Sequence, residues 1–589
     1  MFDDKDPSSD MQRNILLAFA LSALVLVLFS PKSQPKKPDL AKTPVAATQP
    51  AATPNGNDGT SGTNAPAAPP AKAAEIVPAI PAVQAATETD TTVESDLYEI
   101  HFNNRGAVAT SWVLKGFKDG DERQLDVVNP VAVAQVGWPL AVRTDDPDTG
   151  AKLNQALFAV KSTGRVAPTI VTFEYSNGSI AARKEFRFEA GSYIVHITTE
   201  VTRDGRAVAH DVVWRGGFGD RTLENYNTAE TSTLALGDKL EHKTLKDVKT
   251  DEQREAGPFS YVTVEDKFFC AVFMPAGEGG APVIQRASLF KNSYAAGVGK
   301  TLDLLGVAAG GDGVNHFRAY VGPKNLDLLR KISPEPGGDA RLIRGEQVTS
   351  LAPMVDYGWF SFVAIPMYLC LKWISVHIVA NYGWAIVLLT VVINFALLPL
   401  KMSSMKSSQK MQKLAPQVKV IQDRGKKYKM NDPKKQEINE EVMALYKKEG
   451  VNPLGGCLPL VIQIPFFYGF YRMIAQAIEM RHASWLWVPD LSVHEAGWFH
   501  VLPIVMIATM LLLQKMTPQP AGDPAQQKMM MMMPLVFGIG FYNVSSGLVL
   551  YWLTGNLVQM AQQWFFNRTA ADSVAAPPGA VRVRKEARE

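Results

Sequence analysis

An almost wholly apolar run from Leu458 to Ile478 is the feature that most restricts how this chain can fold. Its length matches the ~20 residues that a helix needs to cross the hydrocarbon core of a bilayer. The run nevertheless contains Gln463 and Arg472. A charged side chain at the centre of a membrane helix costs about 2.5–3.5 kcal/mol, so such a residue usually faces protein or water. The sequence therefore predicts a membrane helix, at 456–478, that has a polar face.

Other apolar segments predict five further spans, at 14–29, 382–400, 499–515, 529–543 and 547–562. For the first we favour an uncleaved anchor over residues 1–30, because the apolar run ends without the small-residue cleavage site of a signal peptide, which is the alternative. The apolar segment 357–380 contains Pro366, Lys372 and His377. There we favour an interfacial helix over a span, because another span follows at once.

The residues between the first two predicted spans divide into a linker and a folded domain. Residues 31–92 consist mainly of Ala, Pro, Thr, Gly and Asn, and they predict a disordered tether because they offer little apolar surface to bury. Residues 93–333 contain short alternating runs such as YEIHF (98–102) and YIVHITTEV (193–201), separated by turn residues. This pattern predicts an all-β domain of many short strands, closed by a helix at 325–332.

The segment 401–450 is basic and has two apolar stripes. It contains thirteen Lys and Arg against six Asp and Glu. Met411, Leu414 and Val418 recur at helical spacing, as do Ile438, Val442 and Leu445, so we expect an antiparallel helical hairpin. The positive-inside rule places this hairpin, and the basic tail 571–589, in the cytoplasm. Six spans would place both termini and the hairpin in the cytoplasm and the β domain outside, which agrees with the side of the membrane expected for each segment.

Three short strings match known enzyme motifs only in part. Ala295–Thr301 (AAGVGKT) lacks the first glycine of a phosphate-binding loop, so we expect no nucleotide site. Asp148-Thr149-Gly150 occurs once in a turn-rich stretch, and we expect a turn there. His494-Glu495 lacks the second histidine of a zinc protease, and the three cysteines show no metal spacing. These strings therefore predict no metal site and no cofactor.

Several longer strings resemble one family, the YidC/Oxa-type membrane protein insertases. The matching strings are VNPLGGCLPLVIQIPFFYGFY (451–471), DPAQQKMMMMMP (523–534), SGLVLYW (546–552), LPLK with QKMQKLAP (398–416) and YVGPKNLDLL (320–329). The first string is highly specific, and the resemblance is strong over 350–570. The large domain after the first span resembles the Gram-negative form of the family.

This resemblance implies a membrane α-helical bundle plus an all-β periplasmic supersandwich domain. Six transmembrane helices would include five that form the insertase core (350–570) around a hydrophilic groove, which opens to the cytoplasm and to lipid. A nascent membrane protein would place its polar segment in the groove while its apolar segment enters the bilayer. The resemblance also implies the ribosome and the Sec translocon as partners and the inner membrane as the location, with no specific nucleic-acid site. It implies no catalytic residues, so we expect a protein that is not an enzyme.

The candidate groove residues are Thr390, Asn394, Gln463, Arg472, Trp552 and Asn556. The family usually carries an arginine at the position of Asn394, which is uncharged here. We hypothesise that Arg472 supplies the missing charge; the alternative is that Arg472 lies near the outer interface and extends its head group to it. For the other candidates, packing within the bundle is the competing explanation.

Two further surfaces are candidates for contact with clients. Met529, Met530, Met531, Met532 and Met533 form a soft apolar run that suits varied clients, unless they are plain helix filler. The candidate cytoplasmic docking residues are Lys410, Lys413, Lys426, Lys427, Lys434 and Lys435.

Within the last three predicted spans, the continuous apolar runs 501–513, 529–542 and 548–558 contain only 11–14 residues. They make roughly 17–21 Å of helix against a hydrocarbon core of ~30 Å, so they would thin the bilayer nearby. The alternative function is a secondary transporter with a polar intramembrane cavity, although the chain lacks the internal repeats that transporters tend to show.

Overall fold

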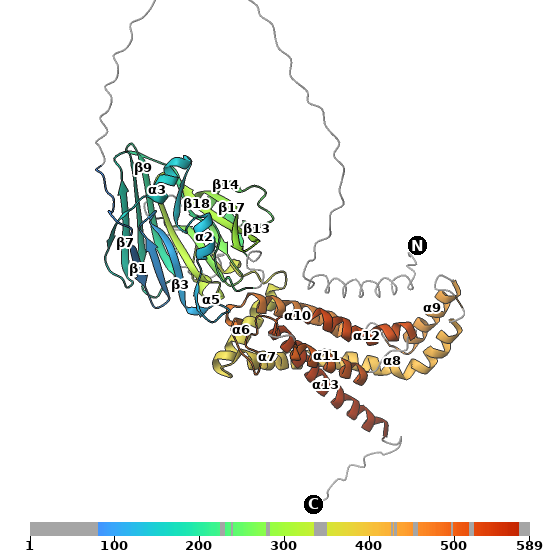
Figure 1. Cartoon of the computed structure of the whole chain (residues 1–589). Coiled ribbons are helices and arrows are strands. Elements are labelled where there is room, and N and C mark those ends of the chain that lie inside the picture. Colours follow the sequence, from blue (N-terminus) through green and yellow to red (C-terminus); the bar gives the residue numbers. More distant parts are fainter. Residues whose placement is uncertain are drawn as a thin grey trace, which may run out of the picture.

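The structure is a computed structural model that describes residues 81–223, 230–236, 239–277, 283–334, 350–425, 428, 433–451, 458–495, 499–517 and 524–575. The predicted anchor at 1–30 and most of the predicted linker at 31–92 lie outside these residues. Figure 1 shows two parts within the described chain: a β-rich part and, after it in sequence, a set of long helices that extends away from it.

Three antiparallel sheets build the β-rich part. One sheet has the order β1-β2-β3-β4, with bounds Asp90–Glu94, Tyr98–Asn103, Val108–Lys118 and Gln124–Asp126. The ten-stranded sheet has the order β13-β12-β15-β16-β19-β9-β8-β7-β6, with β10 (Arg206–Ala207) beside β9. Its other strands are Lys239–Thr244, Thr231–Leu236, Tyr261–Glu265, Phe269–Pro275, Asn315–Pro323, Ile194–Arg203, Ile180–Phe188, Thr169–Ser176 and Ala159–Ser162. The third sheet has the order β14-β17-β18-β11-β5, with bounds Glu252–Phe259, Ile284–Gly297, Lys300–Gly311, His210–Trp214 and Ala141–Thr144.

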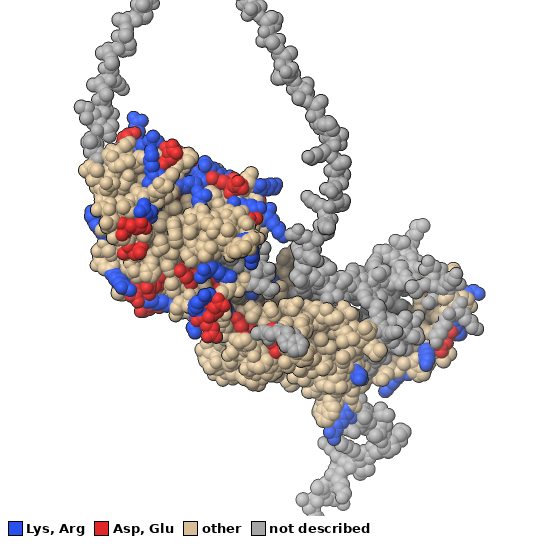
Figure 2. Space-filling view, in the orientation of Figure 1, with Lys and Arg blue, Asp and Glu red and all other residues tan. Residues whose placement is uncertain are grey.

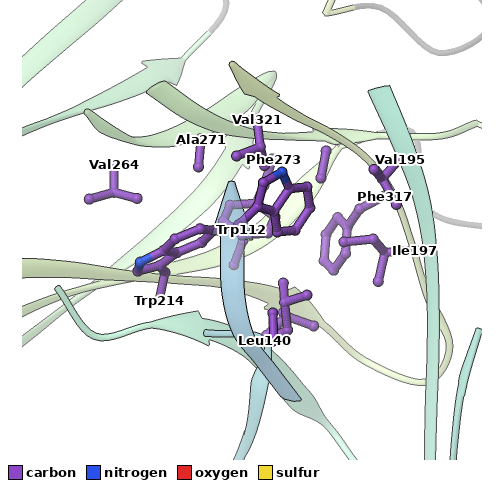
Figure 3. Packing of buried hydrophobic residues seen from close by; sticks show 14 of the residues in the cluster. Trp112, Leu140, Val195, Ile197, Trp214, Val264, Ala271, Phe273, Phe317 and Val321 are labelled. Carbon is purple, nitrogen blue, oxygen red and sulfur yellow. The ribbon is translucent and has the colours of Figure 1, made fainter. Parts of the chain in front are cut away.

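These strands form where the sequence alternates, and the sheets share one aromatic core. Along β2 and β8 every second residue is buried, as expected for a sheet that covers a core with one face. Trp112 of β3 and Trp214 of β11 lie in this core with ring centroids 6.3 Å apart. Figure 3 shows both rings among residues of the ten-stranded sheet such as Phe273 and Ile197. The prediction of a large all-β domain is confirmed.

Three local predictions in this part need correction or qualification. Strand β1 begins at Asp90, inside the predicted linker, because pairing with β2 supplies backbone partners that composition does not reveal. Asp148-Thr149-Gly150 lies in the first turn of α3 (Pro147–Gln155), not in a plain turn, because Asp146 caps that helix. A second short helix, α2 (Pro130–Val136), was also not predicted. The AAGVGKT string forms the turn between β17 and β18, so no helix follows it to hold a phosphate.

The helical part begins with short elements and continues with long ones. In order they are α5 (Leu326–Leu329), η1 (Ala352–Met354), α6 (Ser361–His377), α7 (Tyr382–Ala396), α8 (Leu398–Gly425), α9 (Pro433–Lys448), α10 (Leu458–Gln476), η3 (Ile478–Met480), α11 (Val501–Met516), α12 (Pro524–Gly540) and α13 (Ser546–Ala575). Figure 1 places the β-rich part near α5 and α6 at one end, and α8 and α9 at the other. On the face in Figure 2, charged side chains are sparse along the helices between those ends.

Helices α8 and α9 pack along the two predicted apolar stripes. Met411, Leu414 and Val418 of α8 share a cluster with Val442 and Tyr446 of α9. Near the turn, an ion pair of 2.6 Å joins Arg424 and Glu441. The residues that connect the two helices are mostly outside the described chain.

Helix lengths differ from the predicted spans. No single helix in the described residues combines the length and the apolar content needed to cross a membrane; the pair α7 and α8, bent by 60°, does so by length and composition. The sequence placed the last span at 547–562 and a domain boundary at 570, but α13 continues through both to Ala575. Its extension is rich in Ala, a strong helix former, and Pro577 disfavours helix at the residue before it.

Polar contacts, one of them buried, join the β-rich part and the short helix α5 that follows it to the longer helices. Arg481, just after η3, pairs with Asp220, and the two side chains are 4% and 1% exposed. Glu479 accepts hydrogen bonds from Asn325 (2.9 Å) and from the hydroxyl of Tyr368 (2.5 Å). Lys372 of α6 pairs with Asp327 of α5. The β-rich part is therefore fixed to α6 and to the segment that follows α10.

Candidate functional site

A polar cluster lies where α7 ends and α8 begins. Thr390 is fully buried, and its hydroxyl donates to the carbonyl of Ile386 at 2.7 Å. One turn later the Asn394 amide donates to the carbonyl of Thr390 at 2.8 Å. The Nζ of Lys401 donates to Oδ1 of Asn394 at 2.6 Å. Asn394 and Lys401 are only 3% and 7% exposed, so this contact is inside the protein.

The bend between α7 and α8 accompanies this contact. In a straight helix, seven residues separate two positions by about 10 Å along the axis. Pro399 lacks the N–H that would continue the helix, and its ring crowds the carbonyl four residues earlier, which is that of Phe395. The helices consequently meet at 60°. Lys401 stands in the first turn of α8 and reaches Asn394 across this bend.

Helix α13 closes one side of the cluster. At Gly555 an added Cβ would lie 4.0 Å from the Asn394 amide nitrogen, so the two helices approach closely there. Further along α13, Nε2 of Gln562 donates to the backbone carbonyl of Asn394 at 3.4 Å. The Oε1 of Gln562 is buried and has no hydrogen-bond partner among the described residues. The cluster therefore offers both a cation and an unsatisfied acceptor.

The charge of Lys401 is not neutralised within the described part of the chain. No carboxylate there forms an ion pair with it, and its recorded acceptor is a neutral amide. A buried ammonium without a counter-charge costs several kcal/mol, and the group can donate three hydrogen bonds. Two of these donors remain for water or for an incoming carboxylate or carbonyl. A site of this kind can attract a polar or acidic peptide segment without any covalent chemistry.

The other predicted groove residues make different contacts. The Asn556 amide donates to the Thr509 hydroxyl at 3.1 Å, so it joins α13 to α11. Trp552 packs in an aromatic group instead, with its ring centroid 4.8 Å from that of Phe467 of α10 and 5.3 Å from that of Phe541, which follows α12 directly. Gln463 is half-buried on α10. The structure thus brings Thr390 and Asn394 together and places Asn556 and Trp552 on α13 beside other helices.

Arg472 does not lie with them. Its Nη2 is 2.5 Å from Oδ2 of Asp356 and 2.7 Å from the carbonyl of that residue. It lies near the end of α10 that leads to η3 and the β-rich part, whereas Asn394 lies at the end of α7 that leads to α8. The hypothesis that Arg472 supplies charge beside Asn394 does not match this placement. An acidic partner 116 residues earlier in the chain holds it elsewhere.

The predicted client and docking surfaces are only partly described. Met531 and Met532 are exposed, at 60% and 48%, and Met533 is half-buried; the side chains of Met529 and Met530 lie outside the described residues. Lys410, Lys413 and Lys434 are exposed on α8 and α9. Lys426, Lys427 and the side chain of Lys435 fall outside the described residues.

Sequence reasoning missed the two most informative residues, Lys401 and Gln562. It treated Lys401 only as the polar end of a span, although a cation two helical turns after Asn394 was a usable signal. Gln562 could not be paired with Asn394 without knowing which helices touch. No group of His, Cys, Asp and Glu among the described residues could hold a metal ion.

Comparisons with known proteins give consistent matches over both parts. A family model described as 60Kd inner membrane protein matches residues 373–573, and one for the YidC periplasmic domain matches residues 90–370. A membrane protein insertase YidC from Geobacter sp. (strain M21) is 33% identical over 499 residues, covering 82% of this chain and 86% of that protein. One from Ralstonia nicotianae is 30% identical and covers 95% and 98% of the two chains. A crystal structure titled as an active YidC insertase with the first transmembrane domain resolved is 20% identical, with a TM-score of 0.34, and covers 83% and 96%.

Proposed function

This chain belongs to the YidC family of membrane protein insertases, and on that basis we propose that its polar cluster receives the polar segments of nascent membrane proteins. Family membership makes it an inner-membrane insertase with a periplasmic domain. What we propose is which residues of the chain contact the client during insertion. The client's polar segment enters beside Lys401, and its apolar segment moves along the exposed apolar faces of the helices into lipid.

The buried contact between Lys401 and Asn394 carries this proposal. Asn394 holds the ammonium inside the protein without neutralising it, so the charge is available to a client carboxylate or carbonyl. Next to it, Val392 and Phe395 of α7 are 56% and 58% exposed, which gives an apolar client segment a surface within one turn of the polar cluster. Burial of that segment in lipid, at ~25 cal/mol per Å², supplies the driving force, as no nucleotide motif is present in the sequence.

The proposed arrangement has six spans, with the N and C termini and the hairpin α8–α9 in the cytoplasm. The basic excess of 401–450 supports this orientation. Helix α6 lies at the outer interface, where exposed Trp359 and Trp373 suit the headgroup region. The hairpin receives clients from the ribosome, alone or with the Sec translocon, through the candidate docking lysines, of which Lys410, Lys413 and Lys434 are exposed. The proposed groove consists of Thr390, Asn394, Lys401, Gln463, Trp552, Asn556 and Gln562, and the proposed apolar client surface is Met529 to Met533.

Substitution of Lys401 tests the proposal. In proteoliposomes of the full chain, Lys401→Met should slow insertion of clients with acidic polar segments roughly tenfold or more, since hydrogen bonds to charged groups contribute about 1.5–3 kcal/mol. Lys401→Arg should retain most activity. Lys406→Met, on the same helix but exposed, is the matched control and should not change the rate. Equal rates for Lys401→Met and Lys406→Met would overturn the proposal.

Exchanging the two residues separates charge from position. Lys401→Asn removes the cation, and Asn394→Lys places two cations side by side, so each single change should impair insertion. The double exchange restores one cation and one amide at the same contact and should insert faster than either single variant. If the two changes slow insertion additively, so that the double variant is slower than either single variant, clients do not use this contact.

A further inference from the structure

Basic side chains gather on the edge of the ten-stranded sheet and on the turn that follows it. Strand β13 ends that sheet and carries Lys239 and Lys243, and the turn towards β14 carries Lys246 and Lys249. These four lysines are called the basic edge below. A shallow depression of about 650 Å³ lies here, lined by His242, Lys243, Lys246, Asp247, Lys249, Thr250 and Gln253.

Half of this charge has no ion-pair partner among the described residues. Lys239 and Lys243 both contact Glu241, at 2.5 and 3.0 Å. Lys246 and Lys249 are exposed, and neither forms an ion pair with a described residue. The nearby carboxylate of Asp247 instead accepts from the backbone N–H and the hydroxyl of Thr244, at 2.8 and 2.7 Å. The turn therefore presents two cations to whatever lies in front of it.

The basic edge stands next to the helical part of the molecule. Leu240 of β13 packs against the hydrophobic cluster that includes Tyr357, Leu371 of α6 and Ile474 of α10. In Figure 1, β13 lies on the side of the β-rich part towards which the helices extend, and Figure 2 shows blue side chains along that side. A bilayer around the helices would thus present its outer surface to this edge.

We propose that the basic edge docks on anionic phospholipid headgroups of the outer leaflet and so fixes the periplasmic domain against the membrane. A lysine near an anionic leaflet contributes about fivefold to binding, and the attraction fades within a Debye length. Lysines on edge strands also prevent edge-to-edge aggregation. That role explains Lys239 and Lys243 but not Lys246 and Lys249, which lie beyond the strand. The proposal rests on the orientation given above.

Hydrogen exchange of the full chain in nanodiscs tests this docking. Backbone amides of residues 239–251 should exchange severalfold more slowly in discs that contain phosphatidylglycerol than in discs of phosphatidylcholine alone. The difference should disappear at about 1 M salt, where the Debye length is about 3 Å. Lys246→Gln with Lys249→Gln should remove most of the protection. The control, Lys152→Gln with Lys161→Gln, changes exposed lysines away from this edge, Lys161 on β6 at the opposite end of the sheet, and should preserve it.

Equal exchange of the native chain in both kinds of disc would overturn the proposal, whether or not the variants fold. Protection by inorganic phosphate in phosphatidylcholine discs would also overturn it, because the site would then bind a soluble anion. The readout is lipid contact rather than insertion, so this inference and the proposed role of Lys401 can fail separately.

Discussion

Two buried lysines, Lys184 and Lys401, differ in how many hydrogen-bond acceptors surround the ammonium group. We use this difference to separate a structural role from a proposed functional one. Lys184 of β8 donates to the carbonyls of Gly106, Ala107 and Leu140 at 2.7, 3.0 and 2.8 Å, which uses all three of its donors. Ala107 and Leu140 have φ values of +50° and +66°, so the ammonium satisfies backbone held in a left-handed conformation. Lys401 has one recorded acceptor among the described residues and keeps its remaining donors available.

The Lys184 environment predicts a pH-dependent effect of Lys184→Met. Burial lowers the pKa of Lys184 to about 7, whereas the unfolded chain has its ordinary value of 10.5. The unfolded state therefore binds more protons between these values, and the contribution of Lys184 to stability rises with pH in that window. The free energy of unfolding of the native chain relative to Lys184→Met should increase by about 2 kcal/mol from about pH 7 to pH 9.

Urea unfolding of the two chains, followed by near-ultraviolet circular dichroism, measures this difference. Burial raises the pKa of Glu230 to about 8, so its contribution to stability falls as pH rises and opposes that of Lys184. Because Glu230 is present in both chains, its effect cancels in the comparison. A difference that is constant with pH would show that Lys184 stays charged in the folded protein.

At the scale of elements, the bend at the end of α7 determines where the ammonium group of Lys401, on α8, lies. The periodicity of the sequence gives an apolar helix followed by a basic one, but the 60° angle between them arises from a single residue, Pro399, that cannot continue the hydrogen-bond ladder. This angle brings Lys401 to Asn394, and α13 then covers the pair through Gly555 and Gln562. The candidate site is therefore a property of three helices.

Pro399→Ala should disrupt this site without unfolding the protein. The new N–H can bond to the carbonyl of Phe395, so the two helices gain a tendency to align and Lys401 moves away from Asn394. Insertion should slow, with no loss of thermal stability, in the assay used for Lys401. Pro416→Ala removes another proline inside α8 and is the matched control. Similar slowing by both changes would mean that helix stiffness matters rather than the bend at 399.

At the scale of the whole molecule, the periplasmic domain is joined to the helices by buried charge. Arg481 contacts Asp220 and also lies over the ring of Phe269, 5.5 Å from its centroid. Ile478 of η3 belongs to the hydrophobic core of the β-rich part. The segment that follows α10 is thus packed into the domain rather than merely tethered to it. Movement of the domain would have to break these contacts.

Arg481→Met should loosen this junction. It leaves Asp220 buried without its partner, and breaking a buried pair in this way costs about 3–5 kcal/mol. Hydrogen exchange at residues 477–482 should accelerate, and the domain should become more sensitive to proteolysis at its junction with the helices. Arg472→Met is the matched control, because its partner Asp356 is 58% exposed and such pairs contribute about 0–1 kcal/mol. Equal acceleration of hydrogen exchange in both variants would show that the buried Arg481–Asp220 pair does not hold the domain to the helices.

Periodicity along the chain was sufficient to predict several of the elements. Alternation predicted β2 and β8, because a sheet with one buried face needs an apolar residue at every second position. Helical spacing at Met411, Leu414 and Val418 predicted the face of α8 that packs against α9. Local strings also identified the family. Each of these features depends on residues close to one another in the chain.

Which distant residues meet depends on how the helices pack. Arg472 was a reasonable source of charge for the groove until Asp356 emerged as its partner. Lys401 became important because α7 and α8 bend, and Gln562 because α13 lies against Asn394. A buried charge selects its partner by the geometry of packed helices and by the cost of desolvation, and neither can be read from spacing along the chain.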